Sequence, residues 1–340
     1  TMKHLLTLLL VLPLFGNSQT LVSIMPQQRT ALLEEFTAIN CGNCPAAHAV
    51  ATNLFTQYND QLVGVEVHGG SLANPSSGQP DFRTTDGTAL WSVFGVNFQP
   101  QGTVNREALS GASSWSNAVS NILSQTSPAN IGIAATVENG MLTVDVEVYY
   151  TSTPANNDEI HVALTQDHII GYQQDYGNGA QQNYDHRHVL RDMITDVAGD
   201  PVAVNTLGTL VERTYTLTLD LDWTIADLRV VAFIGPTTGA VYQVKQVNAD
   251  GGITMAVDGQ ERHSMIGAIY PVPATDAVVI NVGPTAAGHI MFLRDATGRV
   301  VLQERVGIGA TNVIMNVSGL AAGLYTAGFI GSKARMIIVE

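Results

Sequence analysis

The chain has few cysteines, few cationic side chains and few aromatic rings for its length of 340 residues. Lys and Arg together number 15 against 29 Asp and Glu, which gives a formal net charge of −14 at pH 7. Nucleic acid is therefore not expected as a partner, because neutralising phosphates requires clustered Lys and Arg. Docking on anionic lipid is disfavoured by the same charge balance.

Long hydrophobic runs are absent as well. The longest, residues 5–15, spans eleven positions, whereas a helix that crosses a bilayer needs about 20. This run follows Lys3 and His4 and precedes small or polar residues, so we expect a signal peptide over 1–18 that is cleaved before Gln19. No cysteine lies near that point to carry a lipid anchor. We therefore expect no transmembrane helix and an exported protein, in which disulfides persist.

The two cysteines lie in the stretch "ALLEEFTAINCGNCPAAHAV", residues 31–50. Residues 31–36 are typical of a short buried strand, and the apolar residues after Cys44 recur at helical spacing. A second strand follows, with alternating valines in 63–67. Strand, helix and strand in this order predict a parallel pair at the start of an α/β domain. The Gly-, Ser- and Pro-rich stretch 69–89 is interpreted as a loop or insertion.

The Cys-x-x-Cys pair permits redox chemistry. A cysteine at a helix N-terminus is favoured as thiolate, which makes Cys41 the nucleophile and Cys44 the resolving thiol. The alternative is a permanent disulfide without chemistry, although so short a loop contributes little chain-entropy stabilisation. A metal site on the cysteines is not expected, because structural zinc takes four ligands and even His48 would supply only a third. We expect no cofactor.

After this unit the periodicity changes. Residues 93–106 resemble strand material interrupted by Pro100, and a helix within 113–125 closes a first domain that spans 19–127. Alternating hydrophobic residues then predict an antiparallel β-sandwich over 128–250. Its expected strands are 131–137, 142–148, 159–165, 212–222, 228–234 and 240–247.

A polar, aromatic and histidine-bearing insertion, 166–200, interrupts this sandwich. His186 and His188 would lie on one face of a strand. Four further residues are candidate helpers of these two: Asp185, Asp192, His161 and His168. We favour an insertion packed across the sandwich over metal binding or catalysis. Serine-hydrolase chemistry is not supported, because the chain lacks a Gly-x-Ser-x-Gly elbow.

A linker over 251–265 leads to a third unit, 266–340, whose short alternating strands predict a small β-sandwich. Its scarcity of aromatic side chains disfavours sugar binding. The stretches "YPVPATDAVVINV", "LRDATGRVV", "VSGLAAGLYTAGF" and "KARMIIVE" make it resemble the type A sorting domain of type IX secretion in Bacteroidetes. The resemblance implies contact with the type IX secretion machinery. It also implies removal of the domain and either release or attachment to surface lipopolysaccharide.

The segment "EEFTAINCGNCP", with its flanking strand and helix, resembles the thioredoxin-like fold. This resemblance implies that Glu35 relays a proton to Cys44. It also implies that Pro100 is cis and faces the dithiol, and that the backbone beside it pairs with substrate. Asn40 and the Gly-Asn dipeptide between the cysteines depart from the thioredoxin pattern, which leaves catalytic activity open.

Residues 31–250 as a whole resemble the outer membrane protein 28-related family of Bacteroidetes, on the stretches "EEFTAINCGNCPAAH", "TVNR" and "HVLRDMI". That family joins a thioredoxin-like domain to an immunoglobulin-like sandwich. The expected fold is therefore α/β plus all-β, with a thioredoxin-like domain, an Ig-like sandwich and a sorting domain in sequence. We expect location at the outer-membrane surface or outside the cell.

Two functions follow as hypotheses. The first is thiol–disulfide exchange on envelope or extracellular proteins, with Cys41 and Cys44 as the reacting pair and Glu35 and Pro100 in support. The second is a non-catalytic surface interaction or adhesion protein with a structural disulfide, in which the middle sandwich binds a partner. The enzymatic hypothesis predicts an exposed Cys41 sulfur beside a cis proline.

Overall fold

The computed structural model describes residues 21–236, 239, 241–254, 266–282, 290–296, 299–307, 309–329 and 335–340. The chain divides into two compact units, Thr1–Ala256 and Val257–Glu340, which are described separately. The predicted signal peptide, 1–18, lies outside the described residues, as does most of the predicted linker. Among the described residues, no helix has the length and apolarity that a membrane crossing requires.

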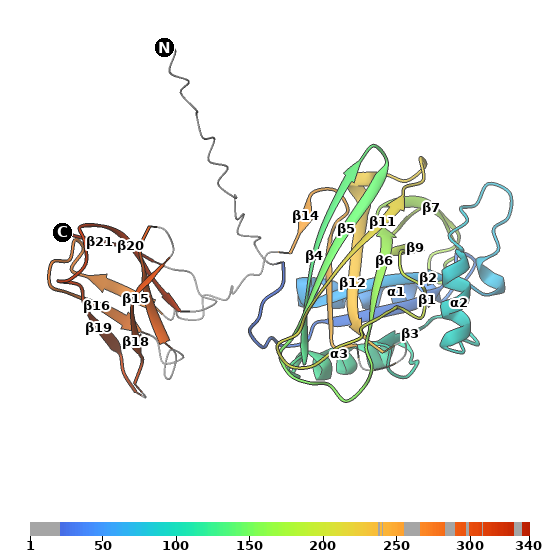
Figure 1. Cartoon of the computed structure of the whole chain (residues 1–340). Helices are drawn as coiled ribbons and strands as arrows, with labels where there is room; N and C mark the ends of the chain where they lie inside the picture. Colours follow the sequence, from blue (N-terminus) through green and yellow to red (C-terminus); the bar gives the residue numbers. More distant parts are fainter. Residues whose placement is uncertain are drawn as a thin grey trace, which may run out of the picture. The chain divides into compact units, whose positions relative to one another are not determined.

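A mixed sheet runs through the whole first unit (Figure 1). Its strands, in spatial order, are β13 (Gln243–Asn248), β12 (Leu228–Gly235), β6 (Glu159–Gln166), β9 (Val189–Met193), β2 (Leu62–His68), β1 (Ala31–Thr37) and β3 (Gln101–Val104). The short β10 (Asp200–Pro201) also pairs with β6. Every residue of β1 and β2 is buried, as is usual for parallel strands that are covered on both faces.

The expected strand, helix and strand are present around the cysteines. Helix α1 (Cys44–Tyr58) connects β1 to β2, and these two strands pair in parallel. Two further helices belong to this part, α2 (Thr85–Val93) and α3 (Trp115–Leu123). Short 3₁₀ turns lie at η1 (Asn59–Gln61), η2 (Ser71–Ala73), η3 (Ala112–Ser114) and η4 (Ile225–Asp227).

Helix α2 differs from the sequence interpretation, which placed loop over 69–89 and strand material from residue 93. The Thr84 side chain caps this helix by accepting a hydrogen bond from the Gly87 backbone N–H. A nine-residue helix that contains glycine gives a weak periodic signal, and its start was obscured by the polar residues before it. The strand is shorter than expected and comprises only β3, after Pro100.

A second sheet covers part of the first and forms a β-sandwich with it. Its order is β11 (Leu210–Thr218), β5 (Met141–Tyr150), β4 (Ala129–Glu138) and β14 (Gly252–Ile253). The sandwich core contains Ile133, Val144 and Tyr150 from this sheet and Ile160 and Val230 from the main sheet. The predicted alternation in β4 and β5 therefore marks the core-facing side correctly.

The expected boundary between residues 127 and 128 lies inside one compact unit. Strand β9 comes from the 166–200 insertion and pairs with β6 on one side and in parallel with β2 on the other. This strand joins the sheet of the N-terminal segment to a sheet of the sandwich. The two segments therefore share backbone hydrogen bonds rather than meeting as separate bodies, a pairing that no local pattern reveals.

The rest of the insertion forms the hairpin β7 (Ile169–Gln173) and β8 (Gln181–His186). The C-terminal unit contains two sheets, one ordered β15 (Ile266–Tyr270), β16 (Ala277–Val282) and β19 (Asn312–Asn316). The other is ordered β18 (Val300–Arg305), β17 (Ile290–Arg294), β20 (Gly323–Phe329) and β21 (Arg335–Val339). Buried side chains from both sheets form one core in this unit. The chain is thus rich in β-structure throughout, with few helices among the described residues.

Candidate functional site

Cys41 and Cys44 form a disulfide at the start of α1. Pro45 follows in the first turn of the helix, where its missing N–H removes no helical hydrogen bond. The exposed fraction is 2% for Cys41 and 0% for Cys44, and both pack with Ala38 and Ala73. In this conformation a protein substrate has no access to either sulfur.

Residues 173–176, which comprise the last residue of β7 and the three that follow it, cover the Cys-x-x-Cys loop; we call them the covering segment. Its backbone N–H groups at Gln174 and Tyr176 donate to the carbonyl oxygens of Ile39 and Gly42, at 2.7 and 2.8 Å. The Gln173 side-chain amide also donates to the Cys41 carbonyl at 3.1 Å. These contacts occupy main-chain acceptors of the Cys-x-x-Cys loop.

Gly42 is required for this arrangement. A Cβ atom at this position would overlap the Tyr176 ring, which lies directly on the loop backbone. The other side of this ring faces solvent, since Tyr176 is 74% exposed. The covering segment therefore closes over the disulfide from outside rather than forming part of a deep core.

The resemblance implied a cis proline, and the Gln99–Pro100 peptide bond is cis. Strand β3 begins directly after Pro100 and pairs antiparallel with β1, so that Gly102 lies opposite Glu35. The exposed Cys41 sulfur that the enzymatic hypothesis predicted is not observed, because the covering segment and Ala73 bury it.

Glu35 belongs to a buried polar cluster beneath α1. In the parallel register of β1 and β2, Glu35 lies opposite Glu66. His48, one turn after Cys44, brings its Nε2 atom within 3.6 Å of Glu35 Oε1. Ligand atoms of all three side chains lie within 4.8 Å of one another. Two carboxyl groups and one imidazole therefore share a site shielded from bulk water.

The hydrogen bonds of His48 fix its ring. Nε2 lies 2.8 Å from the Thr37 hydroxyl, and Nδ1 lies 2.8 Å from the Tyr184 hydroxyl. Two more imidazoles lie nearby and contact each other edge to face, those of His68 and His186. Burial lowers the pKa of His48 to about 3 and that of His186 to about 4, so both rings are neutral at pH 7.

Burial acts in the opposite direction on the two carboxyl groups. It raises the pKa of Glu35 well above its ordinary value, and the nearby Glu66 raises it further. Burial, aided by Asp167, raises the pKa of Glu66 to about 8. The pair therefore holds protons at neutral pH, because two buried carboxylates this close cannot both ionise.

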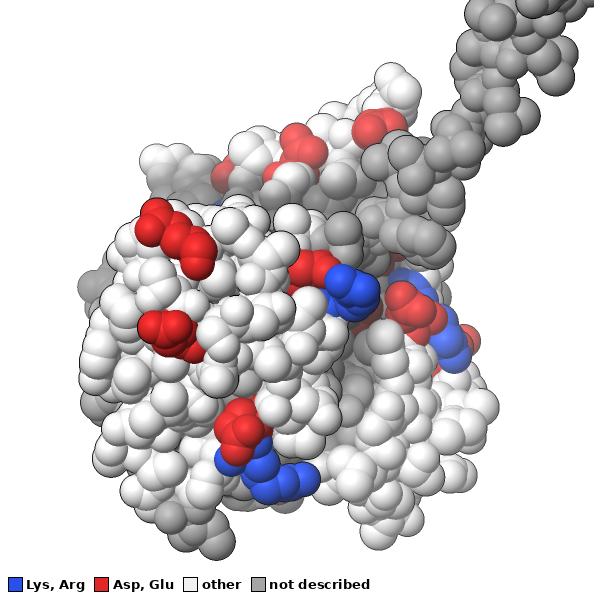
Figure 2. All heavy atoms as spheres, turned by 60° about the vertical axis from the view of Figure 1, so that its left-hand side comes forward, with Lys and Arg blue, Asp and Glu red and all other residues white. Residues whose placement is uncertain are grey.

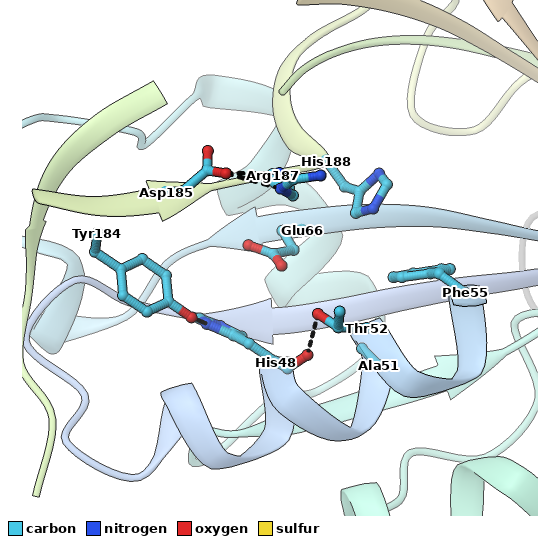
Figure 3. A pocket seen from close by; sticks show the side chains of 9 residues that line it. All are labelled: His48, Ala51, Thr52, Phe55, Glu66, Tyr184, Asp185, Arg187 and His188. Atoms are coloured by element: carbon cyan, nitrogen blue, oxygen red, sulfur yellow. Dashed lines mark hydrogen bonds and ion pairs between the residues drawn. The ribbon is translucent and has the colours of Figure 1, made fainter. Parts of the chain in front are cut away.

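A small cavity of about 40 Å³ opens beside this cluster (Figure 3). His48, Glu66 and Tyr184 line it together with residues of the β8–β9 connection, and Glu66 lies between the Tyr184 and His188 side chains in this view. One water molecule needs about 10–15 Å³ of such volume, so the cavity holds a few small ligands at most. The site fits an ion with water ligands rather than an organic substrate.

Glu34, the neighbour of Glu35, points to the opposite face of β1 and is fully paired. Arg106 donates to both of its carboxylate oxygens, with Nη2 at 2.9 Å from Oε1 and Nε at 3.0 Å from Oε2. The Arg106 guanidinium also lies 4.5 Å from the ring centroid of Phe233. The Asn105 amide accepts from the Leu32 backbone N–H. The "TVNR" stretch is thus an internal anchor between β1 and the sandwich.

The histidines considered for a site in the insertion do not converge on one point. His186 is buried among aromatic rings, and His161 is buried against Phe233. His168 is half-exposed beside Asp185. His188 lines the cavity and lies 3.5 Å from Asp167. The insertion does pack across the molecule, but it packs onto the Cys-x-x-Cys loop as well as the sandwich.

Sequence reasoning found Glu35 and considered His48, but it missed Glu66 and the covering segment. The available signal for Glu66 was its place between Val65 and Val67 in a strand that is buried on both faces. A carboxylate there is rare without a partner. The covering segment had no local signal, because it lies more than 120 residues from the loop that it covers.

Charged side chains are sparse on the surface. On the face shown in Figure 2, the Lys and Arg side chains of the described residues lie beside acidic ones and form no continuous basic patch. Arg187 illustrates such pairing in the β8–β9 connection, where its Nη2 lies 2.7 Å from Asp185 Oδ2.

Two regions of the chain match known protein families. Residues 87–251 match the model of the outer membrane protein Omp28 family, and residues 268–339 match that of the secretion system C-terminal sorting domain. The chain carries an Omp28-family region and a C-terminal sorting domain. It is therefore an exported protein of the outer-membrane surface or the extracellular space, and its sorting domain implies interaction with the type IX secretion machinery.

Three solved structures are among those that resemble this chain. HBP35 of Porphyromonas gingivalis is 18% identical with a TM-score of 0.55, over 92% of this chain and 98% of that one. Protein AGR_C_4864 from Agrobacterium tumefaciens is 12% identical with a TM-score of 0.41, over 66% and 96% of the two chains. A domain of the outer membrane lipoprotein Omp28 from P. gingivalis is 18% identical with a TM-score of 0.26, over 36% and 89%. No curated protein sequence matches the chain.

The Omp28-family region begins inside α2 and ends at residue 251. It crosses the predicted boundary at 127 and includes the 166–200 insertion, in agreement with the shared sheet. It leaves out Glu35, the two cysteines and Glu66. The family match therefore carries no information about the chemistry of the disulfide.

Proposed function

We propose that this exported protein is a non-catalytic surface interaction protein, whose N-terminal part is a thioredoxin-like domain with a permanent Cys41–Cys44 disulfide. The burial of both sulfurs supports this function best, since the covering segment and Ala73 leave only 2% of Cys41 exposed. In this proposal the disulfide holds the Cys-x-x-Cys loop in the shape that receives the covering segment. The middle sandwich supplies the surface that meets a partner.

The test is the accessibility of the disulfide in the folded, full-length protein. We expect dithiothreitol to leave Cys41 and Cys44 oxidised under native conditions and to reduce them in urea, as measured by alkylation and mass spectrometry. We also expect no dithiol-dependent reduction of insulin. Insulin reduction at the rate of a thioredoxin, abolished by Cys41→Ser, would overturn the proposal.

A second candidate, thiol–disulfide exchange, is favoured by the place of Cys41 just before α1 and by the exposure of Tyr176, the residue of the covering segment that lies on Gly42. In this reaction a substrate thiolate attacks the Cys41 sulfur and releases the Cys44 thiolate. A second substrate thiolate then breaks the mixed disulfide. The substrate is thereby oxidised to a disulfide, and the cysteine pair of this chain gains two electrons and two protons.

The two candidates diverge when the covering segment is weakened. Tyr176→Ala removes the ring that lies on Gly42 without touching the cysteines. If exchange is the function, this variant should oxidise a dithiol peptide faster than wild type, and Cys41→Ser should remove the activity from both backgrounds. If the disulfide is only structural, Tyr176→Ala makes the cysteines reducible but gives no turnover. The variant Tyr176→Phe is the matched control, because it keeps the aromatic ring.

We further propose that the sorting domain is removed on export and that the remainder is attached to surface lipopolysaccharide or released. The match over 268–339 supports this step. Deletion of residues 266–340 should trap the protein in the periplasm, as measured by protease accessibility on intact cells. Normal surface display of the truncated chain would contradict it.

A further inference from the structure

Three elements converge on one point of the buried cluster beneath α1. Glu35 comes from β1, His48 from α1 and Glu66 from β2, and ligand atoms of all three lie within 4.8 Å of one another. All three side chains are buried, with exposed fractions of 2%, 6% and 8%. Strand register and helix packing thus bring together residues that are 31 positions apart at most.

Glu35 lacks the partners that a buried carboxylate normally has. Neither of its oxygens takes part in a hydrogen bond with any described residue, and the imidazole of His48 is its nearest basic group, at 3.6 Å. Glu34, one residue earlier, has a bidentate arginine. Buried polar groups without a hydrogen-bond partner are costly, and each one in a native structure calls for an explanation such as an ion or a catalytic role.

The dimensions of the cluster match a small divalent ion. Tetrahedral zinc with bonds of about 2.0–2.2 Å places its ligand atoms roughly 3.4 Å apart. The distance between Glu35 Oε1 and His48 Nε2 is 3.6 Å, and separations of up to 4.8 Å close to the zinc value when two side chains approach each other by about 1.4 Å in total. The 40 Å³ cavity beside Glu66 leaves room for a water ligand at the fourth position.

We propose that Glu35, His48 and Glu66 form a binding site for one divalent transition-metal ion of the zinc class, with water as the fourth ligand. One imidazole and two carboxylates suit zinc and its neighbours in the first transition row. Calcium and magnesium are disfavoured, because both ions prefer six or more oxygen ligands. The cysteines take no part, since the closed disulfide offers no thiolate.

The surroundings orient the ligands as a metal site requires. With Nδ1–H donated to the Tyr184 hydroxyl, His48 presents its Nε2 lone pair to Glu35 and Glu66. The Thr37 hydroxyl, which contacts Nε2 in the metal-free protein, must turn away, and this costs one hydrogen bond. Burial keeps protons on the two carboxyl groups, and a divalent cation would replace these protons.

This proposal goes beyond the proposed function and does not depend on it. A bound ion would neutralise Glu35 and remove it as a proton carrier for the disulfide. Zinc content is measured without any redox assay. Absence of zinc would therefore leave the outcome of the alkylation experiment unaffected.

The experiment uses the full-length protein, stripped with EDTA and then dialysed against micromolar Zn²⁺ in excess over the protein. We expect one zinc per chain by elemental analysis, and X-ray absorption should show one nitrogen and two or three oxygen neighbours without sulfur. Glu66→Gln and His48→Gln should each weaken zinc binding more than about 100-fold in calorimetry, because loss of even an outer partner costs 10–100-fold. Tyr184→Phe, which removes such an outer partner, should weaken it by about 10–100-fold.

His168→Gln is the matched control, because this histidine lies in the same insertion but is half-exposed and outside the cluster. It should bind zinc as wild type does. Zinc binding that survives in Glu66→Gln, or that disappears in His168→Gln, would show adventitious surface binding and overturn the proposal. Absence of zinc from the wild-type protein at micromolar Zn²⁺ would also overturn it. The absorption spectrum needs no variant, so the test holds even if a variant fails to fold.

Discussion

The two faces of β1 each bury a carboxyl group, but they surround it with different partners. Glu34 and Glu35 are adjacent and equally buried, with 2% exposed each. On one face, Glu34 accepts hydrogen bonds from Arg106 through both carboxylate oxygens and is part of the framework that ties β1 to the sandwich. On the other face, Glu35 meets a second carboxyl group and a neutral imidazole. The Glu34 face thus has a paired carboxylate, whereas the Glu35 face has a carboxyl group without a hydrogen bond to any described residue, on which the proposed metal site rests.

The largest loss of stability should follow removal of the cation that pairs with Glu34. Arg106→Met leaves Glu34 buried without its cation, and we expect the free energy of unfolding to fall by about 3–5 kcal/mol. Urea unfolding followed by circular dichroism measures this change. The double variant with Glu34→Gln should recover part of the loss. A fall below about 1 kcal/mol would show that the pair is not a main anchor.

The next largest effect should be a pH dependence of the free energy of unfolding, caused by the buried His186 near the cluster. Burial lowers the pKa of His186 to about 4, so the unfolded chain binds a proton below about pH 6.5 that the folded chain does not. Stability therefore falls as the pH drops from about 6.5 to 4, by up to about 3 kcal/mol from this residue. His186→Phe should flatten this part of the curve of unfolding free energy against pH. An unchanged slope would contradict the assignment.

On the Glu35 face, the dependence of stability on pH should have the opposite sign. The pKa of Glu35 is raised in the folded state, so above about pH 4.5 folding takes up a proton, and stability is lost as the pH rises. In EDTA at pH 7.5, Glu35→Leu should therefore be neutral or stabilise the protein by about 1–2 kcal/mol. Thermal unfolding measures this directly. Destabilisation as large as that of Arg106→Met would remove the distinction between the two faces.

The smallest effect should come from an ion pair outside the buried sheet. Arg187 and Asp185 are bridged at 2.7 Å, but their side chains are 51% and 35% exposed. Arg187→Ala should change the free energy of unfolding by no more than about 0.5 kcal/mol, because solvent screens such pairs. The same urea titration compares it with Arg106→Met. A loss above about 1 kcal/mol would indicate that Arg187 supports the cluster as well as the surface.

The sequence predicts the local elements around the disulfide well. The alternating valines predict β2, the spacing of apolar residues predicts α1, and their order predicts a parallel pair. Glu35 and the cis bond before Pro100 come from the resemblance to thioredoxin-like proteins. The match of the C-terminal stretches to the sorting domain confirms the interpretation of that unit. These features depend on neighbouring residues or on a short motif.

The features that the sequence did not reveal depend on distant contacts. The interpretation of β2 considered only its valine face and left Glu66 unassigned, because a single strand does not reveal that both of its faces are covered. An exposed Cys41 was a prediction of the enzymatic hypothesis alone, and the covering segment that buries this residue lies far away in the chain. The predicted boundary at residue 127 follows the change in periodicity, and the pairing of β9 with β2 across it cannot be read from either strand alone.

The sequence alone determined that the chain is exported, rich in β-structure and equipped with one Cys-x-x-Cys pair before a helix. Composition, periodicity and short motifs are properties of the sequence that can be read without knowledge of the tertiary structure. Only the tertiary structure decided that the disulfide is covered and that Glu35, His48 and Glu66 face one another. Both results arise when segments distant in the chain pack together, because packing fixes which groups lose water and which partners they meet instead.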